Sequence, residues 1–376
     1  MRVYNFGAGN PDPGSFPTIE LAEATARVME RDGDKLVLYP DQRGHAPLRE
    51  VGAVRFAKNH GRDMSIDNMA LTTGSMQAIS LVCQAFLKPG DTIITEEFSY
   101  SGSIRCFRQY GANMVGIPVD DEGMNTDALD EALKDLGRKG TLPKFVYSIG
   151  TNQNPTGTMM PEHRREKLLE ATQRYGIPVV DDDCYADLLF GIPAPKSLYA
   201  MDPDSVIYIG SFSKILGPGM RLGFFSAKDE WLQNMLDWKI DGGTNNFAAF
   251  VAAEYFKDHL WDHIGDINEI VKSKLDVVVD ALDANKDAFL EHSNPKGGLF
   301  IWIKLPEDAD PNRILEIATE KGVRYGTGKA FDSQGRDVHY LRIAFGYASH
   351  DDFREGIPLL AECVREARAI PIPAST

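Results

Sequence analysis

The chain has 376 residues, 43% of them hydrophobic and 25% charged, so it is long enough for two packed lobes and has the composition of an ordinary folded protein. Its 55 acidic residues outnumber 40 basic ones, and the formal charge of −15 disfavours a nucleic-acid partner and requires any phosphate to be held by a local site. Four cysteines without CxxC spacing indicate reduced, mostly buried thiols.

The start of the chain and its apolar segments indicate a cytoplasmic protein. No stretch approaches about 18 uninterrupted apolar residues, the length that spans a membrane. Turn-forming residues such as Gly7, Asn10 and Pro11 follow Met1, where a secretory signal would have a basic and then an apolar stretch. We therefore expect no membrane partner.

Short apolar runs in the middle of the chain alternate with helical patterns, which predicts α/β units around a largely parallel sheet. These runs span residues 92–95, 144–149, 178–181 and 206–210. Residues 245–284 form one long helical pattern, which we expect to bridge two lobes. Beyond it, residues 298–305 and 339–345 predict strands of a smaller α+β unit.

A lysine follows one predicted strand, among small hydroxyl residues and glycines. The run at 206–210 is followed by Ser211, Ser213 and Lys214, and then by a glycine-rich stretch and Arg221. Burial would lower the pKa of this lysine and make its amine a nucleophile toward an aldehyde. Two hydroxyls and a guanidinium are the donors that a phosphate monoester requires, which favours a ligand site over an ordinary surface lysine.

Three other segments place polar groups at element ends. Gly74 and Ser75 precede a predicted helix whose free N–H groups could bind an anion, although Thr73 or Ser75 could simply cap it. The acids at 181–183 end an apolar strand, where they could pair with a protonated ring nitrogen, bind Mg²⁺ or cap a helix. Asn154 follows another strand as an amide donor, or belongs to a turn.

Motifs of other enzyme classes are weak or absent. His259 and His263 have a spacing that metal ligands use, but no glutamate follows His259 and no third ligand is evident, so we expect no metal. The sequence has no Gly-x-Ser-x-Gly, Walker or GxGxxG motif in a strand–turn–helix setting. Hydrolase, phosphate-transfer and dinucleotide-binding functions are therefore unsupported.

Taken in order, these segments resemble fold-type I enzymes that use pyridoxal 5′-phosphate (PLP), specifically class I/II aminotransferases similar to the aminoadipate, kynurenine and multisubstrate group. The resemblance covers nearly the whole chain. Its motifs lie at residues 9–17, 39–50, 73–77, 97–100, 154–157, 182–185, 211–214 and 341–343. It implies an α/β large domain (39–265) with a mostly parallel seven-stranded sheet between helices, a smaller α+β domain (266–376), and an N-terminal segment (1–38) that joins the small domain.

The resemblance also implies catalytic and substrate-binding roles. Lys214 would form the Schiff base with PLP, and Asp182 would pair with the pyridinium nitrogen and keep the ring an electron sink. Asn154 and Tyr185 would hydrogen-bond the 3′ oxygen of the ring. The substrate α-carboxylate would be gripped by Arg342, with Gly9 and Asn154 beside it.

The remaining cofactor contacts implied by the resemblance surround the ring face and the phosphate. Tyr100 would stack on the ring, and Tyr39 would reach the phosphate from a second subunit. The other contacts would come from Gly74, Ser75, the backbone N–H of Met76, Ser211, Ser213 and Arg221. These roles predict a homodimer with shared active sites, which moves an α-amino group between an L-amino acid and a 2-oxo acid by a ping-pong mechanism.

Two alternatives stay open. A PLP-dependent decarboxylase or lyase would share the scaffold and the lysine motif, although Arg342 favours transamination. A GntR-type regulator resembles the chain in the same motifs, but it would carry a winged-helix domain, and only about fifteen residues precede the Ser15–Pro17 segment in this acidic chain.

Three departures from the family pattern concern the site. Met76 stands where relatives often carry a polar residue, the segment before Tyr100 lacks a common proline, and the loop at 322–328 lacks another. None removes a catalytic group, but the last two leave the physiological amino donor open.

Overall fold

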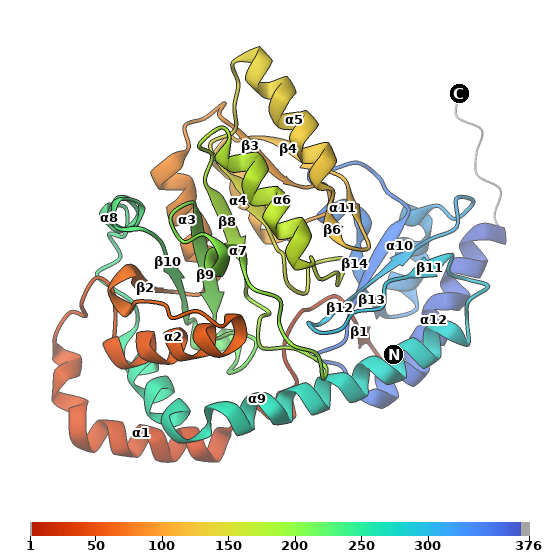
Figure 1. The fold of residues 1–376 in the computed structure, drawn as a ribbon. Coiled ribbons are helices and arrows are strands. Elements are labelled where there is room, and N and C mark those ends of the chain that lie inside the picture. Colours follow the sequence, from red (N-terminus) through yellow and green to blue (C-terminus); the bar gives the residue numbers. More distant parts are fainter. Residues whose placement is uncertain (1, 370–376) are drawn as a thin grey trace.

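The computed structural model describes residues 2–369, and a seven-stranded sheet forms the centre of its larger unit (Figure 1). The strand order is β2-β10-β9-β8-β7-β3-β4, and every neighbouring pair is parallel except the two pairs that β10 makes. The strands are β2 (Met69–Thr72), β3 (Thr92–Glu96), β4 (Asn113–Ile117), β7 (Val146–Ser148), β8 (Val179–Asp182), β9 (Val206–Ser211) and β10 (Gly223–Ser226). The predicted mostly parallel seven-stranded sheet is confirmed, although β7 is shorter than the apolar run at 144–149.

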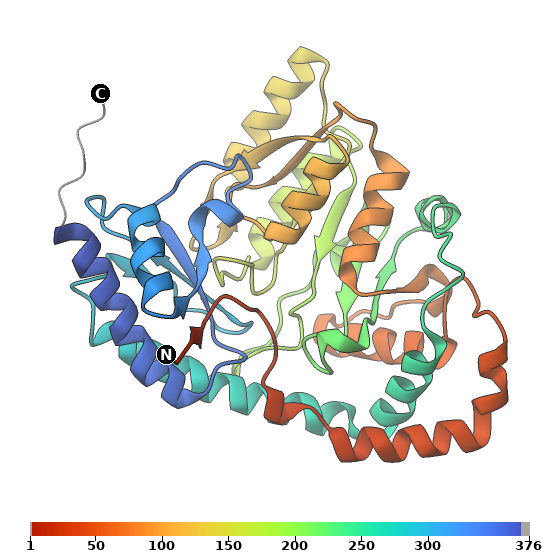
Figure 2. The ribbon, with the colours of Figure 1, turned by 180° about the vertical axis from the view of Figure 1, so that it is seen from behind.

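Helices cover both faces of this sheet, which is why its strands are continuous apolar runs. Figures 1 and 2 show one layer on each side. One layer contains α3 (Ser75–Phe86), α4 (Ser101–Gln109) and α8 (Asp229–Asp237), and the other contains α5 (Thr126–Lys139), α6 (Glu162–Gln173) and α7 (Leu198–Met201). All four residues of β8 and all six of β9 are buried, so the sheet forms the core of the larger unit.

A second, antiparallel sheet has the strand order β11-β12-β15-β14. Its strands are β11 (Glu291–His292), β12 (Phe300–Lys304), β14 (Gly326–Thr327) and β15 (Tyr340–Ala344), accompanied by α10 (Pro311–Glu320), α11 (Gly328–Phe331) and α12 (His350–Ala369). The two strands predicted in this region, at 298–305 and 339–345, correspond to β12 and β15.

The predicted long helix is α9 (Asn246–Asp283), which runs beneath both units in Figure 1. The helices α1 (Thr18–Asp32), α2 (Ala46–His60) and α12 pack on it. Near the N-terminus, β1 (Tyr4–Asn5) pairs in parallel with β13 (Val323–Arg324) of the smaller unit. The N-terminal segment therefore begins at the smaller unit and continues along α9.

The remaining elements are short. They are the hairpin β5 (Val119–Asp120) and β6 (Gly123–Met124), and the 3₁₀ turns η1 (Pro13–Ser15), η2 (Gly33–Val37), η3 (Ile66–Asn68) and η4 (Pro218–Met220). Within residues 2–369, no helix combines the length and apolar character needed to cross a membrane. The four cysteines are buried and unpaired, as the sequence predicts.

The contact between β9 and β10 yields a test of the core. Gly210 pairs with Phe224, and a Cβ at position 210 would lie 2.3 Å from the Phe224 ring. We expect Gly210→Ala to destabilise the protein by about 1–3 kcal/mol through overpacking, measured as a lower urea midpoint. The control is Gly265→Ala on the exposed face of α9, where a Cβ meets nothing within 4 Å. That change should raise stability by about 0.5–1 kcal/mol, and equal effects of the two variants would contradict this account.

Candidate active site

Polar residues from separate parts of the chain line one small cavity at the carboxyl ends of β7, β8 and β9. The cavity has a volume of about 120 Å³. Its walls are Ser75, Met76, Tyr100, Ile149, Asn154, Asp182, Cys184, Tyr185, Ser211, Ser213, Lys214, Pro218 and Arg221. Ten of these are residues that the sequence singled out, and they come from five separate segments of the chain. The edge of a parallel sheet formed by the carboxyl ends of its strands is where ligands of α/β proteins bind.

Lys214 enters the cavity just beyond β9. Its Nζ donates a hydrogen bond to the carbonyl oxygen of Gly9 at 2.8 Å and lies 5.5 Å from the centre of the Tyr185 ring. Burial lowers the pKa of Lys214 to about 8. A substantial fraction of this amine is therefore neutral near pH 7 to 8, which is the form that attacks a carbonyl carbon.

Asp182 lies at the end of β8 and is buried. The hydroxyl of Tyr147 on β7 donates to its Oδ2 at 2.5 Å. Burial raises the pKa of Asp182, while hydrogen bonds from Cys184 and Tyr147 oppose that rise. A buried carboxylate with no cationic partner of its own is suited to bind a cation that a ligand brings.

Gly74, Arg221 and the start of α3 form the opposite, electropositive end of the cavity. Gly74 is the N-cap of α3 and has φ +75°, and a Cβ there would lie 2.7 Å from Nη2 of Arg221. This cap makes no side-chain hydrogen bond, so neither Thr73 nor Ser75 caps the helix in the way that the alternative required. The first N–H groups of a helix have no intrahelical acceptor, which leaves those of Ser75 and Met76 for an anion.

The end of β9 is held by hydrogen bonds beneath the cavity. Ser211 and Ser213 both line it, and the Ser213 amide donates to Oγ of Ser211 at 3.1 Å. The carbonyl of Ser211 accepts from Nη2 of Arg55 at 2.9 Å, and the same guanidinium pairs with the buried Asp187. These contacts fix the backbone from which Lys214 projects.

Arg342 on β15 reaches the cavity from the smaller unit. Its Nη1 donates to Oδ1 of Asn154 at 2.7 Å, and its Nη2 donates to the carbonyl of Gly7 at 2.6 Å. The rings of Phe300 and Phe331 lie 4.3 and 4.4 Å from the guanidinium carbon. Burial lowers the pKa of Arg342 to about 10. Because no carboxylate neutralises this guanidinium within residues 2–369, it is suited to bind a ligand carboxylate.

Tyr185 and Tyr100 complete the walls. Burial raises the pKa of both phenols, so both are neutral donors at physiological pH. Nδ2 of Asn154 lies 3.5 Å from the Tyr185 hydroxyl. The loop before Tyr100 follows the buried Glu96, whose carboxyl group accepts a hydrogen bond from the Ile149 amide at 2.8 Å. This bond links the loop to the end of β7.

Of the predicted site residues that do not line this cavity, Gly9, Gly74 and Arg342 each contact a residue that does, whereas Tyr39 lies on the surface. Its side chain is 91% exposed, and it contributes nothing to the cavity of its own chain. The hydrophobic residues Val37 and Leu38 beside it are 84% and 67% exposed. Three consecutive exposed hydrophobic side chains are consistent with a surface that another subunit covers.

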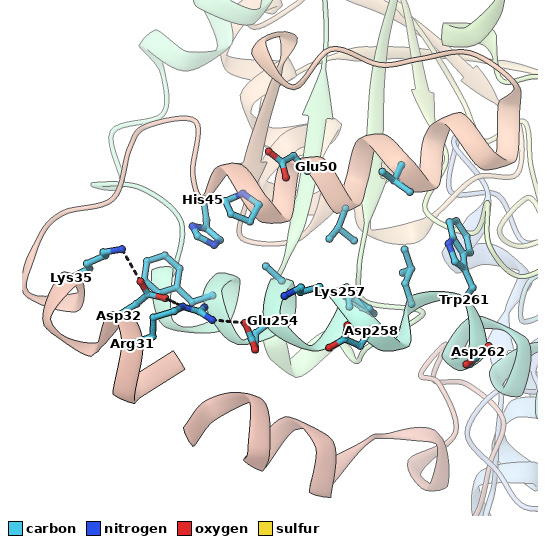
Figure 3. Close-up of a pocket in the computed structure, with 17 residues that line it drawn as sticks. Arg31, Asp32, Lys35, His45, Glu50, Glu254, Lys257, Asp258, Trp261 and Asp262 are labelled. Carbon is cyan, nitrogen blue, oxygen red and sulfur yellow. Dashed lines mark hydrogen bonds and ion pairs between the residues drawn. The ribbon is translucent and has the colours of Figure 1, made fainter. Parts of the chain in front are cut away.

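A larger hollow of about 780 Å³ lies between α1, α2 and α9, and none of the residues lining the Lys214 cavity faces it (Figure 3). Two of its cations are already neutralised, since Arg31 pairs with Glu254 and Lys35 pairs with Asp32. Burial lowers the pKa of His45 to about 4, so this imidazole is neutral. Size alone therefore does not make this hollow the reactive site.

The two histidines on α9 have structural contacts. Nε2 of His263 contacts the carbonyl of Ile215, and the His259 ring stacks on Tyr255 with centroids 5.0 Å apart. Within residues 2–369, no group of three or more His, Cys, Asp or Glu residues is placed to hold a metal ion.

Sequence analysis did not identify Tyr147 or Cys184 as site residues. Both contact Asp182, but Tyr147 belongs to an apolar run of mostly buried residues. Only the pairing of β7 with β8 brings the phenol to the carboxylate. The sole sequence signal was the presence of a polar-tipped aromatic residue in a buried strand, which usually needs a hydrogen-bond partner.

Comparisons with known proteins agree with this geometry. The family model described as aminotransferase class I and II matches residues 2–355. The aromatic-amino-acid aminotransferase 1 of Thermococcus litoralis is 36% identical over 369 residues, which cover 97% of this chain and 88% of that protein. The 2-aminoadipate transaminase of Thermus thermophilus is 32% identical over 374 residues, which cover 98% of this chain and 91% of that protein.

Solved structures extend the likeness to the whole fold. The α-aminoadipate aminotransferase of Thermus thermophilus, complexed with N-(5′-phosphopyridoxyl)-L-leucine, has a TM-score of 0.91 at 32% identity and covers 98% of this chain and 93% of its own. The multiple substrate aminotransferase of Thermococcus profundus has a TM-score of 0.92 at 34% identity, and the match covers 98% of this chain and 92% of that one. The predicted resemblance and fold class are thus confirmed, and a decarboxylase or lyase is not favoured. The chain belongs to the aminotransferase class I and II family, and its reaction is amino-group transfer.

Proposed function

We propose that the cavity at Lys214 binds PLP and that the chain uses it to move an α-amino group between an L-amino acid and a 2-oxo acid by a ping-pong mechanism. One observation carries the proposal: a single cavity joins a half-buried amine, a buried carboxylate and an electropositive helix start. These three groups match the aldehyde, the ring nitrogen and the phosphate of PLP.

The cavity fits the cofactor at both ends. Arg221, the N–H groups at the start of α3, and the hydroxyls of Ser75, Ser211 and Ser213 would bind the phosphate. The absent side chain of Gly74 leaves the space that Arg221 occupies beside that helix start.

At the ring end, Asp182 would bind the protonated ring nitrogen. A neighbouring cation lowers a carboxyl pKa, which opposes the effect of burial and keeps Asp182 ionised. Tyr185 and Asn154 would donate to the 3′ oxygen, and Tyr100 would stack on the ring. Bound PLP supplies an aldehyde that captures amino groups and a ring that accepts electrons from the substrate Cα.

Lys214 and Arg342 would act on different parts of the substrate. Lys214 would hold the cofactor through its amine and, when that amine is free, would take the proton from the substrate Cα. Arg342 binds the α-carboxylate, a group shared by the amino acid and the 2-oxo acid. One site can therefore serve both half-reactions in turn.

The proposal includes a homodimer in the cytoplasm. Tyr39 would reach the phosphate of a second copy, which gives its exposed side chain a function. The division into residues 1–38, 39–265 and 266–376 is kept as part of the proposal.

The first test concerns Lys214. Borohydride reduction of the purified, PLP-loaded protein should fix a pyridoxyl label on this residue, because its pKa of about 8 leaves more of its amine neutral at neutral pH than in a surface lysine. Peptide mapping reads the position of the label. A label on another lysine, or no label, would refute the assignment. An amino donor added alone should release one equivalent of 2-oxo acid, and release of carbon dioxide or ammonia would indicate a decarboxylase or lyase instead.

The second test concerns Arg342. Arg342→Lys replaces a planar fork by a point charge, so we expect a loss of roughly 1.5–3 kcal/mol, or about ten- to hundredfold in kcat/KM, for every substrate alike. The control is Arg313→Lys, because Arg313 pairs with Glu316 on the surface. Unchanged kcat/KM in Arg342→Lys, or a loss for one substrate only, would contradict the proposed role.

The third test asks whether Tyr39 serves the other subunit. Tyr39→Ala and Lys214→Ala should each impair the homodimer. In a purified heterodimer of the two variants, one site would combine an intact Lys214 with an intact Tyr39 from the neighbouring chain, so about half of the wild-type activity should return. If Tyr39 acted within its own chain, neither site would be intact, and no activity above the parent variants would be recovered.

A further inference from the structure

Lys274 on α9 is a buried cation that the transfer reaction does not use. It is 2% exposed, its Nζ pairs with the carboxylate of Asp12, and it donates to the carbonyl of Gly346 at 2.9 Å. Asp12 is also the N-cap of η1, where Oδ1 accepts from the Gly14 amide at 2.7 Å. One ammonium group therefore links the N-terminal region, the long helix and the smaller unit.

Residues 7–12, which we call the crossing segment, run from the end of β1 in the smaller unit to η1, which precedes α1 (Figure 2). Two of their backbone carbonyls contact the active-site cations. The carbonyl of Gly7 accepts from Arg342 at 2.6 Å, and the carbonyl of Gly9 accepts from Lys214 at 2.8 Å. The position of this segment thus sets the position of two acceptors inside the site.

The crossing segment is tightly packed where it meets the site. A Cβ on Gly9 would lie 2.9 Å from the Phe300 ring, and that ring also packs on Arg342. A Cβ on Gly346 would lie 2.3 Å from the carbonyl oxygen of Asn10. Because neither position has room for a Cβ, the backbone here is closely packed, and a shift of the segment would move Phe300 or Arg342 as well.

Within residues 2–369, the pair of Asp12 with Lys274 is the ion pair that a side chain of this segment makes. An ammonium group buried as deeply as that of Lys274 requires its partner, since removal of one member leaves an uncompensated charge. Asp12 is only three residues from Gly9, so a chain fixed at Asp12 has little freedom at Gly9.

We propose that Asp12 and Lys274 form a positioning pair, which holds the crossing segment so that the carbonyls of Gly7 and Gly9 orient Arg342 and Lys214 for substrate. The inference rests on the proposed roles of these two cations. Neither member of the pair touches substrate or cofactor. The pair acts on the binding of the α-carboxylate, the feature that amino acid and 2-oxo acid share.

The test uses the PLP-loaded enzyme and Lys274→Met, which keeps the length of the side chain and removes its charge. We expect KM for the amino donor and for the 2-oxo acid to rise together, by about tenfold, while kcat changes by less than about threefold. The matched control is Lys272→Met, two residues earlier on α9, whose ammonium pairs with Asp276 in solvent and where both side chains are about half exposed. It should leave both constants unchanged.

Asp12→Asn provides a second route, which retains an acceptor for the Gly14 amide and removes only the charge. Amide hydrogen exchange in a peptide covering residues 7–12 should accelerate in both single variants, in the cofactor-free protein as well. The double variant should have the KM of either single variant, because each change breaks the same pair. If Lys274→Met does not fold, Asp12→Asn alone decides the test through KM and exchange.

Three results would overturn the proposal: faster exchange without a change in KM, additive effects in the double variant, or an equal effect of Lys272→Met. Failure of the proposed function looks different. In that case the wild-type enzyme would not transaminate, or Arg342→Lys would leave every substrate unaffected.

Discussion

Strands β7, β8 and β9 are hydrogen-bonded in parallel, with Val146 opposite Val179 and Val179 opposite Val206. Their carboxyl ends therefore reach one edge of the sheet, and whatever follows each strand meets there. The antiparallel strand β10 starts from the same edge, with Gly223 opposite Ser211. A Cβ on Gly223 would lie 2.8 Å from the backbone of Gly74, so this start brings the preceding Arg221 against α3.

The charges inside the site are satisfied by neutral groups. Lys214 and Arg342 donate to neutral carbonyl or amide oxygens, and Asp182 accepts from a phenol. Outside the cavity, Arg55 pairs directly with the carboxylate of Asp187, whereas the buried Arg165 donates to neutral oxygens. A buried charge held only by neutral dipoles gains more from an oppositely charged ligand than a charge that already has a counterion. Lys214 and Asp182 line the cavity and Arg165 does not, so a ligand can reach the first two while Arg165 remains structural.

The hydrogen bonds of Arg342 also explain how the two units are held together. Arg342 comes from the antiparallel sheet of the smaller unit, and the acceptors that hold it come from Asn154 in the larger unit and Gly7 in the N-terminal segment. The substrate carboxylate would therefore bind where three separate parts of the chain meet. Any arrangement of the two units that separated these acceptors would leave a buried guanidinium unsatisfied, so the polar contacts themselves favour the closed packing.

Most of the sheet could be predicted because its strands are apolar runs interrupted by turn residues, and the long helix could be predicted from its periodicity. The strand boundaries differ from the apolar runs: β7 covers three residues of the run at 144–149, and of the flanking residues only Ile149 lines the cavity. The sequence leaves open which residue caps α3, because Thr73 or Ser75 could do so, but in the structure the N-cap is Gly74, which has no side chain.

The sequence by itself determined which reactive groups this protein has and where each one follows a regular element, because lysine, aspartate and arginine with their neighbours form motifs short enough to be local. Only the tertiary structure decided which groups act on one another. Tyr147 and Asp182 are 35 residues apart, and Asp12 and Lys274 are 262 apart, so nothing local links their side chains. Their contacts arise from strand pairing and from the crossing of the N-terminal segment, where burial forces each polar group to find a partner.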